Sequence, residues 1–143
     1  MTTELSQYIL GSVPSAMRHI RKMAFAEADD SISIPQLRIL ASINEGFDQV
    51  STLAKFMGVS QAAISKMVDG MVERELISRA NADDRRVTRL KLTKKGETLN
   101  NKLHSSIEQK IDVFIKDLSK TEKDDLKAGL KVLSKVFSSE KLL

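Results

Sequence analysis

The sequence contains no cysteine, only two histidines and no long apolar run, and each of these absences excludes a class of function. Without cysteine, the chain can form no disulfide bond, no thiolate metal site and no thiol redox switch. No apolar run approaches the roughly 18 residues that a membrane-spanning helix needs, and the N-terminus lacks the order of a signal peptide. We therefore expect a cytoplasmic protein, and 143 residues are enough for one domain with its own core.

Catalytic motifs are also missing. The sequence has no Gly-rich phosphate loop and no Gly-x-Ser-x-Gly elbow. His19 and His104 fall within predicted helices, while Asp83 and Asp84 are neighbours in a turn beside two arginines, which does not suit paired acid and base catalysis. We expect neither an enzyme nor a cofactor or metal site.

The pattern that begins at Ser51, its expected cap, indicates two helices joined by a tight turn. Leu53, Ala54 and Met57 recur on one face of the first helix, and Gly58 supplies the left-handed turn residue that other side chains resist. This arrangement is a helix-turn-helix.

The second helix of this motif begins after Ser60, which is expected to cap it, and Val59 is expected to fill the space between the two helices. Its inward stripe is Ile64, Met67, Val68, Met71 and Val72. Its outward face carries Gln61, Ala62, Ser65, Lys66 and Asp69. Because the N-terminal part of that face is small and polar, it suits a helix that enters a DNA major groove about 12 Å wide.

A β-hairpin is predicted next. Residues 76–80 form a short strand pattern and residues 81–86 a charged turn. Residues 87–92 alternate, with Val87, Arg89 and Lys91 on one face and Thr88, Leu90 and Leu92 on the other. A helix-turn-helix followed by such a hairpin is a winged helix.

Positive charge is concentrated beside this motif. The formal net charge is +4, but the segment from Arg79 to Lys102 has eight basic and three acidic residues, a local charge of +5. A local basic patch on a balanced chain favours a polyanionic partner, although such a run is also compatible with a solvated surface.

Apolar residues recur at helical spacing in both terminal regions. In residues 5–28, Pro14 either kinks the helix or marks its start near Ser12. Pro35 suits the first turn of a following helix, with Ser33 as its cap, and Gly46 is expected to end it. After Thr93, a long helix is expected to reach Leu118, and a last helix to begin with the capping pair Thr121 and Asp124. The apolar stripes of these helices favour a two-fold dimer, and a monomer with folded-back helices is the alternative.

At these residues the sequence resembles the MarR family of bacterial transcription regulators. The matching positions are Leu53-Ala54, Gly58-Val59-Ser60, Leu76-Ile77, Arg79, Asp84-Arg85-Arg86 and Leu92-Thr93-Lys94-Lys95-Gly96. Two positions depart from the family pattern. Glu75 replaces the usual helix-ending Gly, so we expect the helix to lack its left-handed terminal residue, and Gly70 stands where a longer side chain is usual. Gly70 costs roughly 1 kcal/mol of helix propensity and is expected to loosen or bend the helix.

The fold class that follows is mainly α with a small β-hairpin. One domain, 1–143, would comprise a winged-helix DNA-binding lobe at about 35–92 and dimerisation helices at about 5–28 and 93–138. The expected function is a transcription regulator, a repressor, that binds palindromic operators in double-stranded DNA as a homodimer. A winged helix used for protein contacts without DNA is the alternative.

The expected DNA contacts come from the second motif helix, the hairpin and the start of the long helix. Phosphate contacts are assigned to Arg79, Lys94 and Lys95, and base-edge contacts to the face that begins after Ser60 and includes Gln61, Ala62, Ser65 and Lys66. Arg85 or Arg86 would enter the minor groove, and the resemblance implies that Asp84 orients Arg86, although the pair could also be an exposed salt bridge. The resemblance also implies a small-molecule effector site, for which Met17, Arg21 and Ile39 are candidates.

Overall fold

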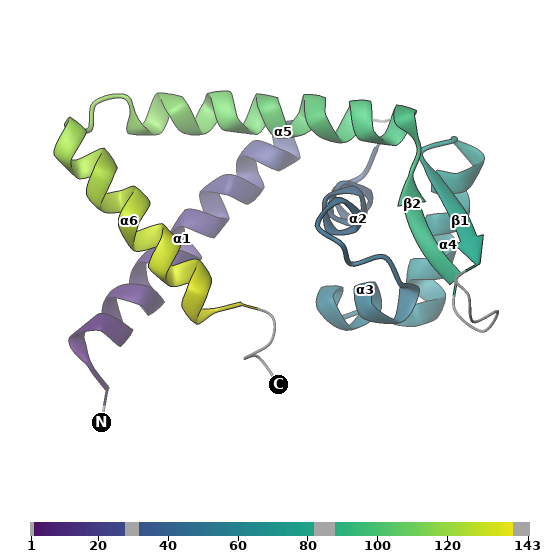
Figure 1. Ribbon diagram of the computed structural model, residues 1–143, viewed down its shortest axis with the longest axis horizontal. Helices are drawn as coiled ribbons and strands as arrows, with labels where there is room; N and C mark the ends of the chain where they lie inside the picture. The colour runs from purple at the N-terminus through teal and green to yellow at the C-terminus, as the bar shows by residue number, and fades with distance from the viewer. Residues whose placement is uncertain (1, 28–31, 82–87, 139–143) are drawn as a thin grey trace. The chain divides into compact units, whose positions relative to one another are not determined.

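The computed structural model describes residues 2–27, 32–81 and 88–138 (Figure 1). Its elements are, in chain order, α1 (Glu4–Glu27), α2 (Ile34–Asn44), α3 (Val50–Met57), α4 (Gln61–Glu73), β1 (Ile77–Asn81), β2 (Thr88–Leu92), α5 (Lys94–Ile115) and α6 (Lys120–Val136). The chain divides into two compact units, residues 1–108 and 109–143. Within the described ranges, no helix is both long and apolar enough to cross a membrane.

The core of the first unit lies among α2, α3, α4 and the hairpin. Its buried side chains are Ile32, Ile39, Leu40, Ile43, Leu53, Ala54, Ile64, Val68, Met71, Leu76, Ile77, Leu90 and Leu92. The residues of α4 that face this core recur at a spacing of three or four, and those of β2 at a spacing of two, as an amphipathic helix and a half-buried strand require. This arrangement confirms the predicted fold class, a mainly helical chain with a winged-helix lobe.

Several predicted helix boundaries are also confirmed. Ser33 caps α2 in a reciprocal capping box with Gln36, and Pro35 lies in the first turn. The Ser60 hydroxyl accepts the N–H of Ala63 at 3.1 Å. Thr93 caps α5, because its hydroxyl accepts the N–H of Gly96 at 3.0 Å.

Other boundaries differ from the prediction. Helix α1 starts at Glu4 and continues through Pro14, so of the two alternatives the start near Ser12 is wrong. Thr3 fixes this start, since its hydroxyl accepts the N–H of Ser6 at 3.1 Å. Helix α3 starts before Ser51, with Gln49 at its N-cap, because the Gln49 carbonyl already accepts the N–H of Leu53 at 3.0 Å.

The end of α5 and the N-cap of α6 also differ from the predicted residues. Helix α5 ends at Ile115, before the predicted Leu118. The cap of α6 is Ser119 paired with Glu122, rather than Thr121 with Asp124. Both pairs have the spacing of a capping box, and Ser119 is the one that has the extended backbone of an N-cap.

Two predictions about the motif itself are wrong. Val59 does not fill the space between α3 and α4, because its side chain is 42% exposed and only its N–H bonds inward, to the Ala54 carbonyl at 3.1 Å. The end of α4 does have its left-handed residue, since Glu75 itself adopts φ 60°. Helix α4 also runs without a break through Gly70.

Candidate nucleic-acid interface

The exposed face of α4 is the first part of the candidate interface. Gly58, at φ 68°, ends α3 in the left-handed conformation and lets the chain turn directly into α4. Ile64, Val68 and Met71 anchor α4 in the core, each with 0% exposure. The opposite face presents Gln61, Ala62, Lys66 and Asp69 to solvent, with Ser65 half-buried beside them. The first turns of α4 therefore expose small, polar and basic groups, as predicted.

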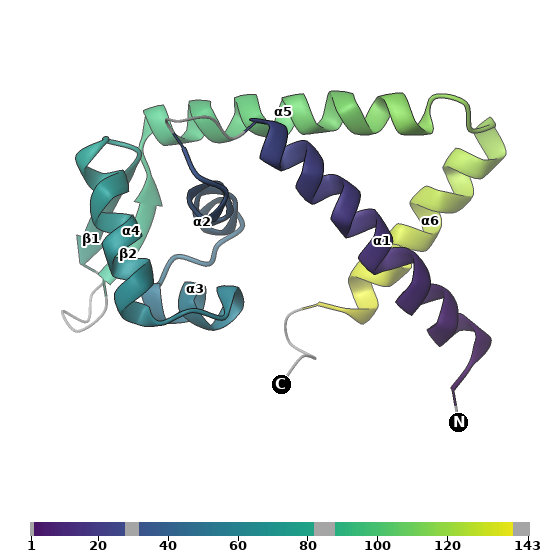
Figure 2. The ribbon, with the colours of Figure 1, turned by 180° about the vertical axis from the view of Figure 1, so that it is seen from behind.

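The hairpin folds back along α4. Its strands pair in antiparallel register from Ile77 with Leu92 at the base to Asn81 with Thr88 at the far end. Because β1 starts close after the C-terminus of α4 and returns alongside the helix, the far end of the hairpin points the same way as the N-terminus of α4 (Figures 1 and 2). The structure thus places the first turns of α4 and the far end of the hairpin at one end of the lobe.

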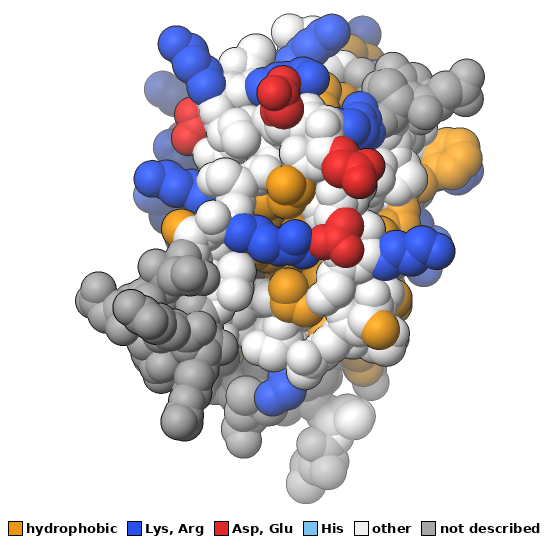
Figure 3. All heavy atoms as spheres, turned by 90° about the vertical axis from the view of Figure 1, so that its right-hand side faces the viewer, with side chains coloured by type: hydrophobic (Ala, Val, Ile, Leu, Met, Phe, Trp, Pro, Cys, Tyr) orange, Lys and Arg blue, Asp and Glu red, His pale blue; other side chains and the backbone are white. Residues whose placement is uncertain are grey.

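An ion pair joins the hairpin to α4. The Arg79 guanidinium of β1 donates to the Asp69 carboxylate of α4 at 2.5 Å, and both side chains are substantially exposed. Basic and acidic side chains both appear on the side of the lobe that Figure 3 shows. Arg79 is therefore not a free cation in this structure. Beyond its opposite charge, nothing in the sequence pattern marks Asp69 as the partner of Arg79.

Asp48, in the segment between α2 and α3, makes a second connection to the hairpin. Its carboxylate accepts from the Arg89 guanidinium at 2.8 Å, and its backbone carbonyl accepts the N–H of Leu90 at 2.7 Å. A side-chain bond and a backbone bond from one residue fix β2 against the helix-turn-helix. Sequence reasoning identified neither Asp48 nor its role.

Lys94 and Lys95 lie at the opposite end of α4. The Lys95 ammonium donates to the carbonyl of Arg74, the C-cap of α4, at 3.1 Å, and the Thr93 hydroxyl donates to the Glu75 carbonyl. Helix α4 has 13 residues, so its two ends are roughly 20 Å apart. The structure therefore does not bring these two lysines together with the first turns of α4.

The remaining predicted contacts are placed as follows. Asp84, Arg85 and Arg86 lie outside the described residues. Of the candidate ligand residues, Ile39 is fully buried in the core, whereas Met17 and Arg21 are exposed on α1. Among the described residues, no three His, Cys, Asp or Glu side chains are grouped as a metal site would require.

Helices α2, α3 and α4, with the outer face of α4 exposed and a β-hairpin beside it, form a winged helix-turn-helix. This fold is a class of DNA-binding domain. Residues 31–87 match the family model described as MarR family. The uncharacterized HTH-type transcriptional regulator YfiV of Bacillus subtilis (strain 168) is 27% identical over 112 residues, which are 77% of this chain and 70% of that protein.

Solved structures with similar folds include RV1404 from Mycobacterium tuberculosis, at 26% identity and a TM-score of 0.74, covering 94% of this chain and 95% of that one. Wild-type MarR from E. coli, in its apo form, has a TM-score of 0.67 at 22% identity, and the match covers 93% of this chain and 98% of that one. This similarity is one of fold. The chain is thus similar to MarR family transcription regulators, in sequence over residues 31–87 and in fold over most of its length.

Proposed function

We propose that this protein is a DNA-binding transcription regulator of the MarR type, a cytoplasmic, non-enzymatic repressor that binds an inverted-repeat operator as a homodimer and is released by a small-molecule effector. The observation that carries the DNA-binding part is the exposed N-terminal half of α4 at the same end of the lobe as the far end of the hairpin. A major groove accepts a single helix, and its base edges are distinguished by hydrogen-bonding side chains. Gln61 and Lys66 are the exposed side chains of that half with the longest reach.

In the proposed complex, Gln61, Ala62, Ser65 and Lys66 face base edges, and Ser60 holds the first turn of α4 in place. Arg85 or Arg86 remains assigned to the minor groove, with Asp84 orienting Arg86. Arg79 contributes a phosphate contact only when its guanidinium reaches past Asp69. Lys94 and Lys95 are not included in this interface. Lys95 bonds the Arg74 carbonyl at the C-terminal end of α4, and Lys94 lines the same hollow as Arg74.

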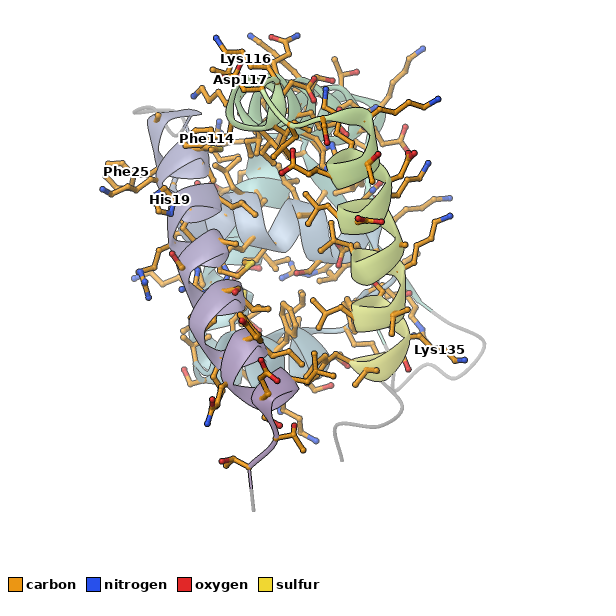
Figure 4. All side chains as sticks on the ribbon, turned by 90° about the vertical axis from the view of Figure 1, so that its left-hand side faces the viewer. His19, Phe25, Phe114, Lys116, Asp117 and Lys135 are labelled. Carbon is orange, nitrogen blue, oxygen red and sulfur yellow. The ribbon has the colours of Figure 1, made fainter. Side chains whose placement is uncertain are left out.

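Exposed apolar side chains on the terminal helices support the dimer. Leu5, Tyr8 and Leu10 of α1 are at least 64% exposed, and every described residue of α6 except Leu133 is exposed. Figure 4 shows many side chains of both helices projecting from the ribbon. Large exposed apolar surfaces of this kind are characteristic of interaction sites, and a second copy of the chain is the partner that we propose.

The proposal can be tested by selecting bound DNA from a random library and measuring affinity for the consensus. We expect an inverted repeat with half-site centres about 10 base pairs apart, one helical turn. Inserting five base pairs between the half-sites should abolish tight binding, because it rotates one site by about half a turn. Equal affinity for the lengthened site, or a monomer in sedimentation at micromolar concentration, would contradict the rigid dimer.

Residue assignments are tested on the same DNA. Gln61→Ala should cost about 1 to 3 kcal/mol, relax base preference at one position and leave the salt dependence unchanged, because it removes a base contact without removing charge. Lys116→Ala is the matched surface control, since Lys116 lies beyond the end of α5 (Figure 4). An unaltered consensus for Gln61→Ala would remove this residue from the interface.

A further inference from the structure

The far half of the hairpin lies outside the hydrophobic core. On β2, Leu90 and Leu92 are buried, whereas Thr88 and Arg89, which lie nearer the far end, are exposed. On β1, residues 78–80 are exposed as well. Apolar burial therefore fixes the base of the hairpin only, and a two-stranded hairpin is marginally stable by itself. The position of the far half depends on polar contacts with the rest of the lobe.

Two ion pairs supply such contacts, each to a different element. Arg79 of β1 binds Asp69 of α4, and Arg89 of β2 binds Asp48, which precedes α3. Asp48 makes the more extensive connection, because its backbone carbonyl also accepts the N–H of Leu90 at 2.7 Å. Its side chain is 33% exposed, against 60% for Asp69, so solvent screens its charge less. Of the two aspartates, Asp48 therefore constrains its strand more closely.

The segment that carries Asp48 is itself attached to the first two helices of the motif. The ring of Phe47 stacks on that of Phe56 of α3, with ring centroids 5.4 Å apart and 12° between the planes. Phe47 also packs against the core, and its N–H donates to the Ser42 carbonyl of α2 at 2.9 Å. Asp48 is thus anchored to α2 and α3 by its neighbour and to β2 by its own two bonds. It links the hairpin to the helix-turn-helix.

We propose that Asp48 is a positioning residue for DNA recognition. By holding Arg89, it sets where the far half of the hairpin lies relative to α4, and so which DNA can contact both elements at once. Asp48 does not touch DNA in this account, and Arg89 is engaged by Asp48 rather than by a phosphate. The inference rests on the proposed function, because it requires that α4 and the hairpin contact the same DNA. A fixed placement favours binding by reducing the ordering that association requires.

The sign of the effect separates positioning from simple electrostatics. Removing a carboxylate near bound DNA ordinarily tightens binding, because repulsion from the phosphates is lost. We expect Asp48→Ala instead to weaken binding to the selected consensus by about 2- to 5-fold, the range that one exposed ion pair supports. Asp48→Asn keeps the shape and removes only the charge, so it should give a smaller loss. Fluorescence anisotropy at one fixed salt concentration measures both.

Two neighbours provide matched controls. Glu97 and Lys91 line the same hollow as Asp48 and Arg89, and neither forms an ion pair among the described residues. Glu97→Ala removes the same charge as Asp48→Ala and should leave affinity unchanged or higher. Lys91→Ala gives the loss expected from removing one cation, and Arg89→Ala should exceed it by the factor that Asp48→Ala shows.

A double variant and a second selection exclude a merely structural role. Asp48→Ala combined with Arg89→Ala should bind no more weakly than Arg89→Ala alone, because both residues act through one bond. Selection with Asp48→Ala should relax the consensus at positions that Gln61→Ala leaves unchanged. The position that depends on Gln61 should keep its base preference, since α4 stays anchored in the core by Ile64 and Val68. A general loss of stability would weaken binding without this division.

A measurement without DNA keeps the two proposals separate. Hydrogen exchange of the Leu90 amide, followed by NMR on the full chain, reports opening of its bond to the Asp48 carbonyl. Asp48→Ala should speed this exchange by about 2- to 5-fold, and Glu97→Ala should not change it. If the native chain selects no DNA, the proposed function fails, whereas the link between Asp48 and β2 is still tested by this exchange.

Four results would overturn the inference. They are consensus binding by Asp48→Ala that is as tight as that of the native chain or tighter, unchanged exchange of the Leu90 amide, and additive losses in the double variant. The fourth is a salt dependence for Arg89→Ala that falls by about one unit more than for Lys91→Ala, because Arg89 would then contact a phosphate.

Discussion

Gly96 offers the sharpest test of how the hairpin is joined to α5. It lies buried in the first turn of α5, and a Cβ atom at this position would overlap the backbone carbonyl oxygen of Leu76 and lie 3.0 Å from the carbonyl carbon. That carbonyl cannot withdraw freely, because it accepts the N–H of Thr93 at 3.1 Å and belongs to a residue whose side chain is buried. Gly96→Ala must therefore separate α5 from the base of the hairpin.

The size of the effect follows from opposing terms. Alanine gains about 1 kcal/mol over glycine in helix propensity. Overpacking against backbone costs about 1 to 3 kcal/mol. The bonds from Thr93 to the Leu76 and Glu75 carbonyls, each worth about 1 kcal/mol, are weakened or lost. We expect Gly96→Ala to lower the free energy of unfolding by about 2 to 4 kcal/mol.

Urea unfolding followed by circular dichroism, at one fixed protein concentration, measures this change. Gly70→Ala in α4 and Gly129→Ala in α6 are matched controls, because a Cβ atom at either position would meet nothing within 4 Å. Both controls should raise the free energy of unfolding by about 0.5 to 1 kcal/mol. A Gly96→Ala protein with the midpoint of the controls would refute the close approach of α5 to Leu76.

Two further substitutions test the ends of α4 and its ion pair. Asp69→Asn should change the free energy of unfolding by less than about 1 kcal/mol, because the ion pair with Arg79 is exposed. It should tighten DNA binding at low salt, because it frees a cation beside the proposed interface. Weaker binding in fluorescence anisotropy would show that Asp69 holds Arg79 in its DNA-binding position. Glu75→Gly should raise the free energy of unfolding by about 1 kcal/mol, because Glu75 is left-handed at φ 60°; a lower urea midpoint would mean that side-chain contacts outweigh the backbone strain.

The elements that could be predicted from the sequence are those encoded by local periodicity. Leu53 and Ala54 mark the buried face of α3, and Leu90 and Leu92 that of β2, and all four side chains are buried. Each pattern needs only a few consecutive residues and one hydrophobic core, so no knowledge of distant contacts is required. The helix-turn-helix and the hairpin, and with them the exposed face of α4, follow from such patterns.

Features set by competition between similar signals could not be predicted. Ser119 and Thr121 both stand three residues before an acid, and the sequence does not rank them, although only Ser119 caps α6. The contact between Asp48 and Arg89 joins residues 41 positions apart in a chain rich in both charges. Opposite charge alone does not select one such pair among many.

The basic segment from Arg79 to Lys102 shows why local net charge does not locate a binding surface. Two arginines on its described strands, Arg79 and Arg89, are paired with aspartates that precede the segment in sequence. Lys94 and Lys102, which have no such pair among the described residues, line a hollow beside Arg74, at the opposite end of α4. Because β1 reverses direction at the end of α4, neighbours in sequence are divided between two ends of the lobe. The salt dependence of DNA binding should therefore be smaller than a count of the basic residues in this segment implies.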